Sequence, residues 1–410
     1  MANKQVEYKG WDAGVNNLAP DIDLPTDQYG KIIALRDGVN VDILTSGDVR
    51  RRSGIRQVVP DANAHSVYAN DNIMIWASPT ALRVADANLT VRASLMSPKL
   101  AKPISYVTVN ERTYFSNEDI NGIINADGTY EPWGIIPPKA APALSGAAGN
   151  RKYQLTCTFV TKTGEESGAP LGNTISCGDT PNISVSNIPQ SSDPRVVATR
   201  LYVTNIDGTI FYRAADIPAG ITSTALNGFF ASGATLRTQF MVPPPPGQLL
   251  EYSNGVIYIA SGQTVYHTAP LRYGAYKPDD NFYMYAERVT LVKAVPNGLY
   301  VGADLIYFLA GAATGDVTQA QVSLGRAVEG AHCELPNTED VMFVTDRGFI
   351  RGSSGGQVTN LTEKQIALNF YARGALGYSE SNGHKTVIGL FGESKPNPAI
   401  AKDFLNSNGI

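Results

Sequence analysis

The chain has 410 residues, of which 43% are hydrophobic and only 17% are charged, and it contains 39 Gly and 25 Pro. The charged share lies below the usual quarter while turn-forming residues are plentiful, which favours a turn-rich β protein over a helical one. The formal net charge is −4, so the chain lacks the basic surplus that tight binding of nucleic acid requires.

The sequence shows no sign of export or membrane insertion. The N-terminus has no apolar core behind its positive charge, and no apolar run approaches the roughly 18 residues of a membrane span. Cys157, Cys177 and Cys333 form no Cys-x-x-Cys motif and are odd in number. This pattern favours reduced thiols in a cytosolic setting.

The first third of the chain begins with an arm and continues with hairpins. Residues 1–30 are polar and rich in turn formers, which predicts an extended N-terminal arm without a core of its own. Residues 31–136 contain successive hairpin patterns, and the turns near residues 79 and 118 lie 39 residues apart. Short strands at this spacing are typical of β-propeller blades.

Two proline runs interrupt this rhythm. The first is Pro137-Pro138, and the second is Pro243-Pro244-Pro245-Pro246. Because proline runs make stiff linkers, residues 137–246 are predicted to be an inserted domain. Alternating apolar and polar residues at 153–159 and 199–204 predict a fibronectin-like or immunoglobulin-like β-sandwich there.

Residues 247–393 repeat a turn dipeptide followed by a short apolar strand. Asn254-Gly255 and Asn297-Gly298 are 43 residues apart, Asn382-Gly383 lies 85 residues further on, and Glu339-Asp340 fills the phase between. Asn-Gly supplies the positive φ of a tight hairpin turn. One such sheet cannot bury both faces alone, so the units must stack. With the insert set aside, the spacing predicts a β-propeller of about six or seven blades.

The end of the chain departs from this pattern. Residues 362–372 are the one clear helix candidate, although their apolar face is loose. Residues 394–410 are rich in Pro and Asn and are predicted to be a C-terminal surface arm.

Residue types that perform catalysis are scattered. The histidines His65, His267, His332 and His384 lie far apart, and no metalloprotease, nucleophile-elbow or P-loop motif is present. The acidic pairs Glu165-Glu166 and Asp279-Asp280 have the loop context of solvated turn residues. We therefore predict a protein that is not an enzyme and that holds no cofactor and no metal.

Several motifs in a fixed order resemble the tail nozzle proteins of short-tailed bacteriophages, also called tail tubular or packaged-DNA stabilisation proteins. The resemblance covers most of the chain. The motifs are Gly14-Val15-Asn16-Asn17, Leu35-Arg36-Asp37-Gly38-Val39-Asn40-Val41-Asp42, Gly47-Asp48-Val49-Arg50-Arg51-Arg52-Ser53-Gly54, Arg195-Val196, Arg200-Leu201-Tyr202-Val203-Thr204, Gly298-Leu299-Tyr300-Val301-Gly302 and Tyr307-Phe308-Leu309-Ala310-Gly311.

The resemblance implies a structural virion protein of the phage tail, assembled in the host cytoplasm. In that family a β-propeller carries an inserted sandwich-like platform domain. Six copies form a ring below the head-to-tail adaptor, and the double-stranded genome passes through its axis without sequence-specific binding. The implied partners are therefore other copies of the chain, the adaptor and neighbouring tail proteins.

Two groups of residues are candidates for contacts in such a ring. Arg50, Arg51 and Arg52 form either a solvated strand face or a contact with an acidic surface of a neighbouring subunit or the adaptor, because the planar arginine fork suits carboxylates. The aromatic run after residue 270 either packs between blades or forms a subunit interface, where tyrosine is enriched. Its members are Tyr273, Tyr276, Phe282, Tyr283 and Tyr285.

Two other functions fit parts of the sequence. A tail fibre or receptor-binding protein would share the β-rich composition, although fibres are usually trimers. A propeller glycosidase acting on surface polysaccharide would keep two or three carboxylates at the central axis. At the predicted blade starts only Asp340 has a matching phase.

Overall fold

The computed structural model describes residues 10–395 apart from 45, 53, 55, 62, 229–232, 313–315, 324 and 382–383. In this part of the chain the helical elements are two three-residue 3-10 turns, η1 (Asp21–Asp23) and η2 (Pro98–Leu100), and the rest of the regular structure is β-strand. The predicted all-β class is therefore confirmed. The chain divides into a continuous unit, Asn63–Met284, and a discontinuous unit, Met1–Ala62 with Tyr285–Ile410.

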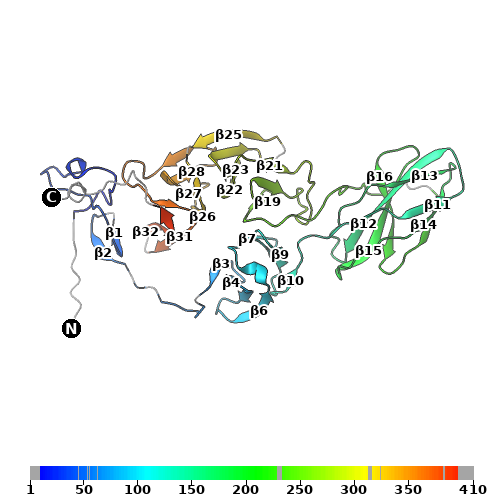
Figure 1. The fold of residues 1–410 in the computed structure, drawn as a ribbon, viewed down its shortest axis with the longest axis horizontal. Helices are drawn as coiled ribbons and strands as arrows, with labels where there is room; N and C mark the ends of the chain where they lie inside the picture. The colour runs from blue at the N-terminus through cyan, green and yellow to red at the C-terminus, as the bar shows by residue number, and fades with distance from the viewer. Residues whose placement is uncertain are drawn as a thin grey trace. The chain divides into compact units, whose positions relative to one another are not determined.

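Four-stranded antiparallel meanders, in which strands pair in the order of the chain, form much of the continuous unit (Figure 1). The first consists of β3 (His65–Ala69), β4 (Met74–Ser78), β5 (Ala81–Ala85) and β6 (Val91–Met96). The second consists of β7 (Ser105–Val109), β8 (Arg112–Ser116), β9 (Asn121–Ile124) and β10 (Tyr130–Glu131). The third consists of β18 (Leu249–Ser253), β19 (Val256–Ser261), β20 (Thr264–His267) and β21 (Phe282–Met284).

Residues 137–246, here called the inserted segment, form two sheets that pair among themselves (Figure 1, green). One sheet has the order β11 (Ala143–Gly146), β14 (Asn182–Ser186) and β17 (Thr224–Asn227). The other has the order β13 (Asn173–Cys177), β12 (Arg151–Thr161), β15 (Val196–Thr204) and β16 (Phe211–Pro218).

One hydrophobic core joins the two sheets of the inserted segment. Leu155 of β12 and Leu201 of β15 are fully buried in it, and Ile183 and Val185 of β14 meet them from the other sheet. Burial of each such side chain stabilises the fold by about 1.5–3 kcal/mol.

The discontinuous unit contains further meanders and smaller pairings among its described residues. One meander is β22 (Leu291–Val295), β23 (Gly298–Gly302), β24 (Ile306–Ala310) and β25 (Thr318–Ser323), and another is β26 (Ala327–Glu334), β27 (Val341–Thr345), β28 (Gly348–Gly352) and β29 (Val358–Asn360). The two-stranded pairings are β1 (Val41–Ile43) with β2 (Val49–Arg51), β30 (Phe370–Tyr371) with β33 (Ser394–Lys395), and β31 (Gly374–Ser381) with β32 (His384–Phe391).

The hairpin turns follow the expected dipeptides at some positions and depart from them at others. Asn254 and Gly255 have φ values of 47° and 82°, and they connect β18 to β19 in antiparallel register. Asp207, with φ 52°, lies in the turn between β15 and β16. At Asn297-Gly298 the expected positive φ is absent, because Gly298 already belongs to β23 and pairs with Val295 of β22, so the turn residues are Pro296 and Asn297. The turn predicted at Asn382-Gly383 lies outside the described residues, as do residues 1–9 and 396–410 of the two predicted arms.

The helix predicted for residues 362–372 is wrong. The chain makes a single turn there, with Ile366 donating to the Thr362 carbonyl at 2.9 Å, and then becomes extended. Asn17 binds both backbone groups of Ala367, accepting from its amide at 2.9 Å and donating to its carbonyl at 3.1 Å. These groups are therefore not free for the i to i−4 hydrogen bonds of a helix. A contact with a residue 350 positions away has overridden a weak local pattern.

Candidate functional site

The inserted segment meets the meanders of the continuous unit at a place that we call the root. On the outgoing side, buried Trp133 donates from Nε1 to the Tyr273 carbonyl at 2.6 Å, and its ring lies 5.1 Å from that of Tyr114 in β8. Gly134 follows with a φ of +80°, and a Cβ there would lie 2.3 Å from the Gly274 carbonyl oxygen. Glycine is therefore required where the chain leaves the meander.

The returning side of the root is paired through its backbone. Val242 and Tyr276 exchange two hydrogen bonds of 2.9 and 3.0 Å, and Phe240 donates to the Ala169 carbonyl at 2.9 Å. Backbone groups that are bonded in this way resist local opening. The connection is thus held on both sides instead of swinging on a single strand.

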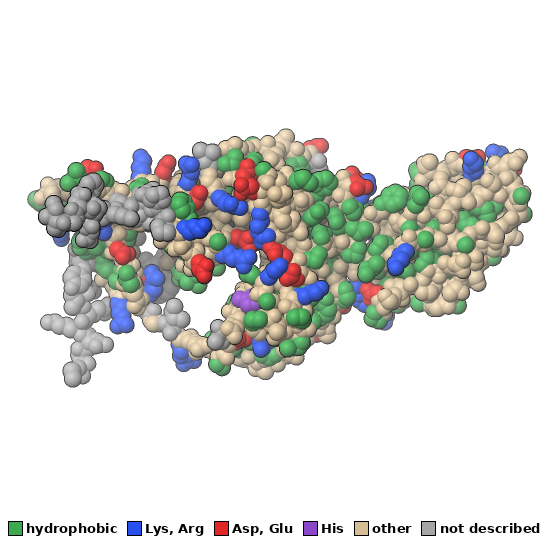
Figure 2. Space-filling view, in the orientation of Figure 1, with side chains coloured by type: hydrophobic (Ala, Val, Ile, Leu, Met, Phe, Trp, Pro, Cys, Tyr) green, Lys and Arg blue, Asp and Glu red, His purple; other side chains and the backbone are tan. Residues whose placement is uncertain are grey.

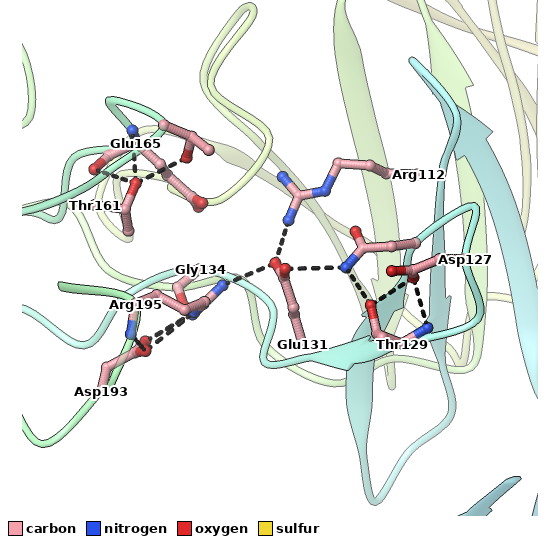
Figure 3. Close-up of polar contacts among 11 residues, drawn as sticks. Arg112, Asp127, Thr129, Glu131, Gly134, Thr161, Glu165, Asp193 and Arg195 are labelled. Carbon is pink, nitrogen blue, oxygen red and sulfur yellow. Dashed lines mark hydrogen bonds and ion pairs between the residues drawn. The ribbon is translucent and has the colours of Figure 1, made fainter. Parts of the chain in front are cut away.

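An ion-pair network crosses the root, centred on Glu131 of β10 (Figure 3). Arg112 of β8 and Arg195, which precedes β15, approach Glu131 Oε2 at 2.6 and 3.4 Å. Arg195 also donates to Asp193 at 2.7 Å and to the Gly134 carbonyl at 2.8 Å. The hydrogen bond from Arg195 lowers the pKa of Asp193, so the carboxylate stays ionised. The network links the inserted segment to the meander from which it leaves.

Glu165 lies beside this network but is not part of it (Figure 3). Its amide donates to Thr161 Oγ1 at 3.1 Å, which fixes the turn after β12. A Cβ on Gly274 would lie 2.2 Å from Glu165 Oε1, so the carboxylate rests against a glycine. Burial raises the pKa of Glu165, although the charges of Arg112 and Arg195 act in the opposite direction. Among the described residues, none forms an ion pair or a hydrogen bond with this carboxylate.

A cavity of about 330 Å³ opens beside Glu165. Its lining residues include Glu165, the aromatic residues Tyr114 and Tyr273, and the basic residues Arg112 and Arg272. Arg112 is already neutralised by Glu131, whereas Glu165 and Arg272 form no ion pair with any described residue. The cavity therefore offers one uncompensated carboxylate and one uncompensated guanidinium.

Glu166 corrects the expectation that the Glu165-Glu166 pair is solvated. Its side chain is 11% exposed and accepts hydrogen bonds from Thr158 at 2.6 Å and Tyr202 at 2.7 Å. Arg200 approaches it at 3.4 Å. The prediction of a solvated loop residue was wrong for Glu166 because β12 pairs with β15, and this pairing places Thr158, Arg200 and Tyr202 beside its carboxylate.

The three predicted arginines lie in or beside β2 and are all exposed. Arg52 binds Asp42 at 2.9 Å. Arg50 pairs in register with Asp42, and Arg51 pairs with Val41, so Arg50 and Arg51 point to opposite faces of the hairpin. Neither Arg50 nor Arg51 forms an ion pair with a described residue.

The predicted aromatic run is divided between core and surface. Tyr276 is only 8% exposed and packs on Tyr266 at 5.5 Å, which leaves its ring little surface for a partner. Tyr273 packs on Tyr114 and belongs to the root. Tyr283 stacks on His267 at 5.5 Å, while Phe282 is 37% exposed on the edge strand β21.

The other groups singled out in the sequence lie outside the root. The described residues contain no cluster of three or more His, Cys, Asp or Glu that could hold a metal ion. Desolvation, assisted by the charge of Lys293, lowers the pKa of His332 to about 3, and burial raises the pKa of the Cys157 thiol to about 12. Asp340 forms an ion pair with Arg351. Within the described residues no helix has the length and apolar character needed to span a membrane.

Sequence reasoning did not predict the root network. Arg112 and Glu131 are 19 positions apart, and Arg195 lies a further 64 positions along the chain. The available signal in the sequence was the presence of charged residues near the start of the inserted segment and within it. That signal identifies which charges pair only when the strand pairing is known.

Comparisons with known proteins give no family. No family model and no curated protein matches the chain. Solved structures with similarity include BBS1N in complex with ARL6DN, with 11% identity, a TM-score of 0.33 and coverage of 81% of this chain and 90% of that one. Kluyveromyces lactis Hsv2p has 10% identity and a TM-score of 0.29, with coverage of 82% of this chain and 99% of that one. The Neurospora crassa Pan2 WD40 domain has 10% identity and a TM-score of 0.31, with coverage of 74% of this chain and 82% of that one. A likeness this weak says nothing about what the chain binds.

Replacing Arg195 with alanine tests the root network. The Arg195 and Asp193 side chains are each 17% exposed, so the variant leaves the poorly exposed Asp193 carboxylate without its partner, while Glu131 keeps Arg112. We expect Arg195→Ala to lower the free energy of unfolding by about 2 kcal/mol in chemical denaturation. The matched control is Arg151→Ala, whose side chain is 50% exposed beside Asp179 and should cost less than about 1 kcal/mol. Equal losses in the two variants would contradict the role given to Arg195.

Replacing Glu165 with glutamine tests the uncompensated carboxylate. Because burial raises the folded-state pKa of Glu165, the charged form destabilises the fold above that pKa. Glu165→Gln should therefore increase the free energy of unfolding at pH 7 by about 1 kcal/mol. This gain should shrink as the pH falls through the folded pKa, because wild-type Glu165 then becomes neutral too. Denaturation curves between pH 7 and pH 3 measure it, and a gain that stays constant with pH would contradict the interpretation.

Proposed function

We propose that this chain is a structural virion protein, the nozzle of a short-tailed bacteriophage tail. Six copies form a ring below the head-to-tail adaptor, through which the genome is retained and ejected. The ordered motifs from Gly14-Val15-Asn16-Asn17 to Tyr307-Phe308-Leu309-Ala310-Gly311 support this assignment.

The proposal takes the meanders as blades of a β-propeller and the inserted segment as a sandwich-like platform domain. Adjacent meanders meet through their first strands, β7 beside β18 in the continuous unit and β22 beside β26 in the discontinuous unit. Strand β31 lies beside β26 in the same way, so the β31–β32 hairpin takes the position of a further blade. This supports a count of six blades, the last of them partial.

The observation that carries the proposal is the bracing of the root. An inserted segment that must transmit load needs a connection that neither bends nor slides. Here the Val242–Tyr276 backbone pairing and the Glu131 network act on opposite sides of that connection. This arrangement suits a passive wall that maintains its shape.

The surface chemistry agrees with passage of DNA without tight binding. On the face displayed in Figure 2, Lys and Arg side chains are interspersed with Asp and Glu. Affinity for DNA rises steeply with the number of phosphates that are neutralised, so a mixed surface holds a sliding duplex less firmly than a basic one.

The mass of the native assembly tests the proposal. We expect native mass spectrometry of the purified protein to show six copies of the 43.8 kDa chain. Electron microscopy of the same sample should show rings with a central opening. Three copies would favour a fibre instead, and a monomer at every concentration, alone or mixed with the adaptor, would contradict the proposal.

A further inference from the structure

We infer that the Glu165 cavity receives Arg51 from a second copy of this chain. The inference rests on the proposed ring and identifies one of its contacts. The unpaired carboxylate of Glu165 and the unpaired guanidinium of Arg51 have opposite charges.

The cavity has the chemistry to hold a guanidinium. Its volume of about 330 Å³ lies at the lower end of the range for sites that enclose small ligands. Glu165 supplies a carboxylate to which no described residue is bound, and the part-exposed Tyr273 supplies aromatic surface, whereas Tyr114 is only 3% exposed. A cation above such rings gains further attraction, most strongly where water is excluded. A guanidinium in this cavity would thus meet the Glu165 carboxylate and the Tyr273 ring.

The other charges around the cavity limit what can enter. Arg112 is neutralised by Glu131, and Glu166 is neutralised by Arg200. Arg272 also lines the cavity and repels any entering cation, and this repulsion grows with the number of positive charges. A single arginine therefore fits better than a basic cluster or a nucleic acid.

The β1–β2 hairpin presents such an arginine. Arg51 is exposed, and the residue opposite it in β1 is Val41. Arg51 therefore has no carboxylate directly across the hairpin from it. Arg50 and Arg52 share the opposite face with Asp42. The planar fork of arginine suits a carboxylate such as that of Glu165.

A second copy is the partner that this pairing indicates. Ring contacts are heterologous, so each subunit must carry two different complementary patches. The β1–β2 hairpin carries the unpaired guanidinium of Arg51, and the cavity carries the unpaired carboxylate of Glu165. The cost of desolvating Glu165 is offset when the partner's arginine enters.

Charge reversal in the full-length chain tests the inference. Arg51→Glu should raise the apparent dissociation constant of the ring about tenfold or more, measured by mass photometry across protein concentrations. Arg50→Glu is the matched control, because it makes the same change one position away on the opposite face, and it should leave assembly within about twofold of wild type. Glu165→Lys should impair assembly, and Glu165→Gln, which keeps the size of the side chain, should impair it less.

Mixing the two defective chains gives the sharpest result. In a one-to-one mixture of Arg51→Glu with Glu165→Lys, every contact of an alternating ring pairs opposite charges, so rings should form although neither chain forms them alone. Rescue in a single doubly reversed chain without rescue in the mixture would indicate a contact within one chain and overturn the inference. If wild type forms rings and Arg51→Glu assembles like Arg50→Glu, the proposed Arg51–Glu165 contact is wrong but the proposed ring is not contradicted. If wild type forms no ring, both the proposed function and this inference are contradicted.

Discussion

Glu131 has to compensate two arginines at once, and that requirement fixes how the inserted segment leaves the meanders. Arg112 comes from the same four-stranded sheet, whereas Arg195 comes from the inserted segment itself. Removing Glu131 leaves Arg112 without an ion-pair partner among the described residues, and removing Arg195 does the same to Asp193, in a partly buried place where the cost is larger than at the surface. Because Gly134 permits the close approach and Trp133 is held by a backbone carbonyl, the charges and the chain path specify the same geometry.

The same region contains the Glu165 carboxylate, which has no ion-pair or hydrogen-bond partner among the described residues. Glu165 is desolvated beside two arginines that are already committed to other carboxylates. An isolated domain would be more stable with an amide at this position, whereas an assembling subunit can use the charge for a partner. Stability and assembly therefore make opposite demands on this residue, as is common where a protein site serves a function.

The sequence predicted the local parts of this structure and missed the distant ones. Asn254-Gly255 was sufficient to predict a hairpin because its positive φ values are a property of those residue types. The predicted helix at residues 362–372 failed because Asn17, 350 positions away, binds the backbone of Ala367. For the candidate site, Tyr273 was singled out from its aromatic neighbours, but Glu131 was not, since its pairing with Arg195 depends on a strand topology that spans 64 positions.

The central claim is that the inserted segment and the meanders that carry it form one rigid body, and hydrogen exchange at the root of the wild-type protein tests it most directly. The amides of Val242 and Tyr276 donate the backbone hydrogen bonds that close the root. If the root is rigid, these amides exchange as slowly as those of β15, the buried central strand of the inserted segment. Exchange at the rate of an open loop, with β15 still protected, would show a hinge and contradict the account.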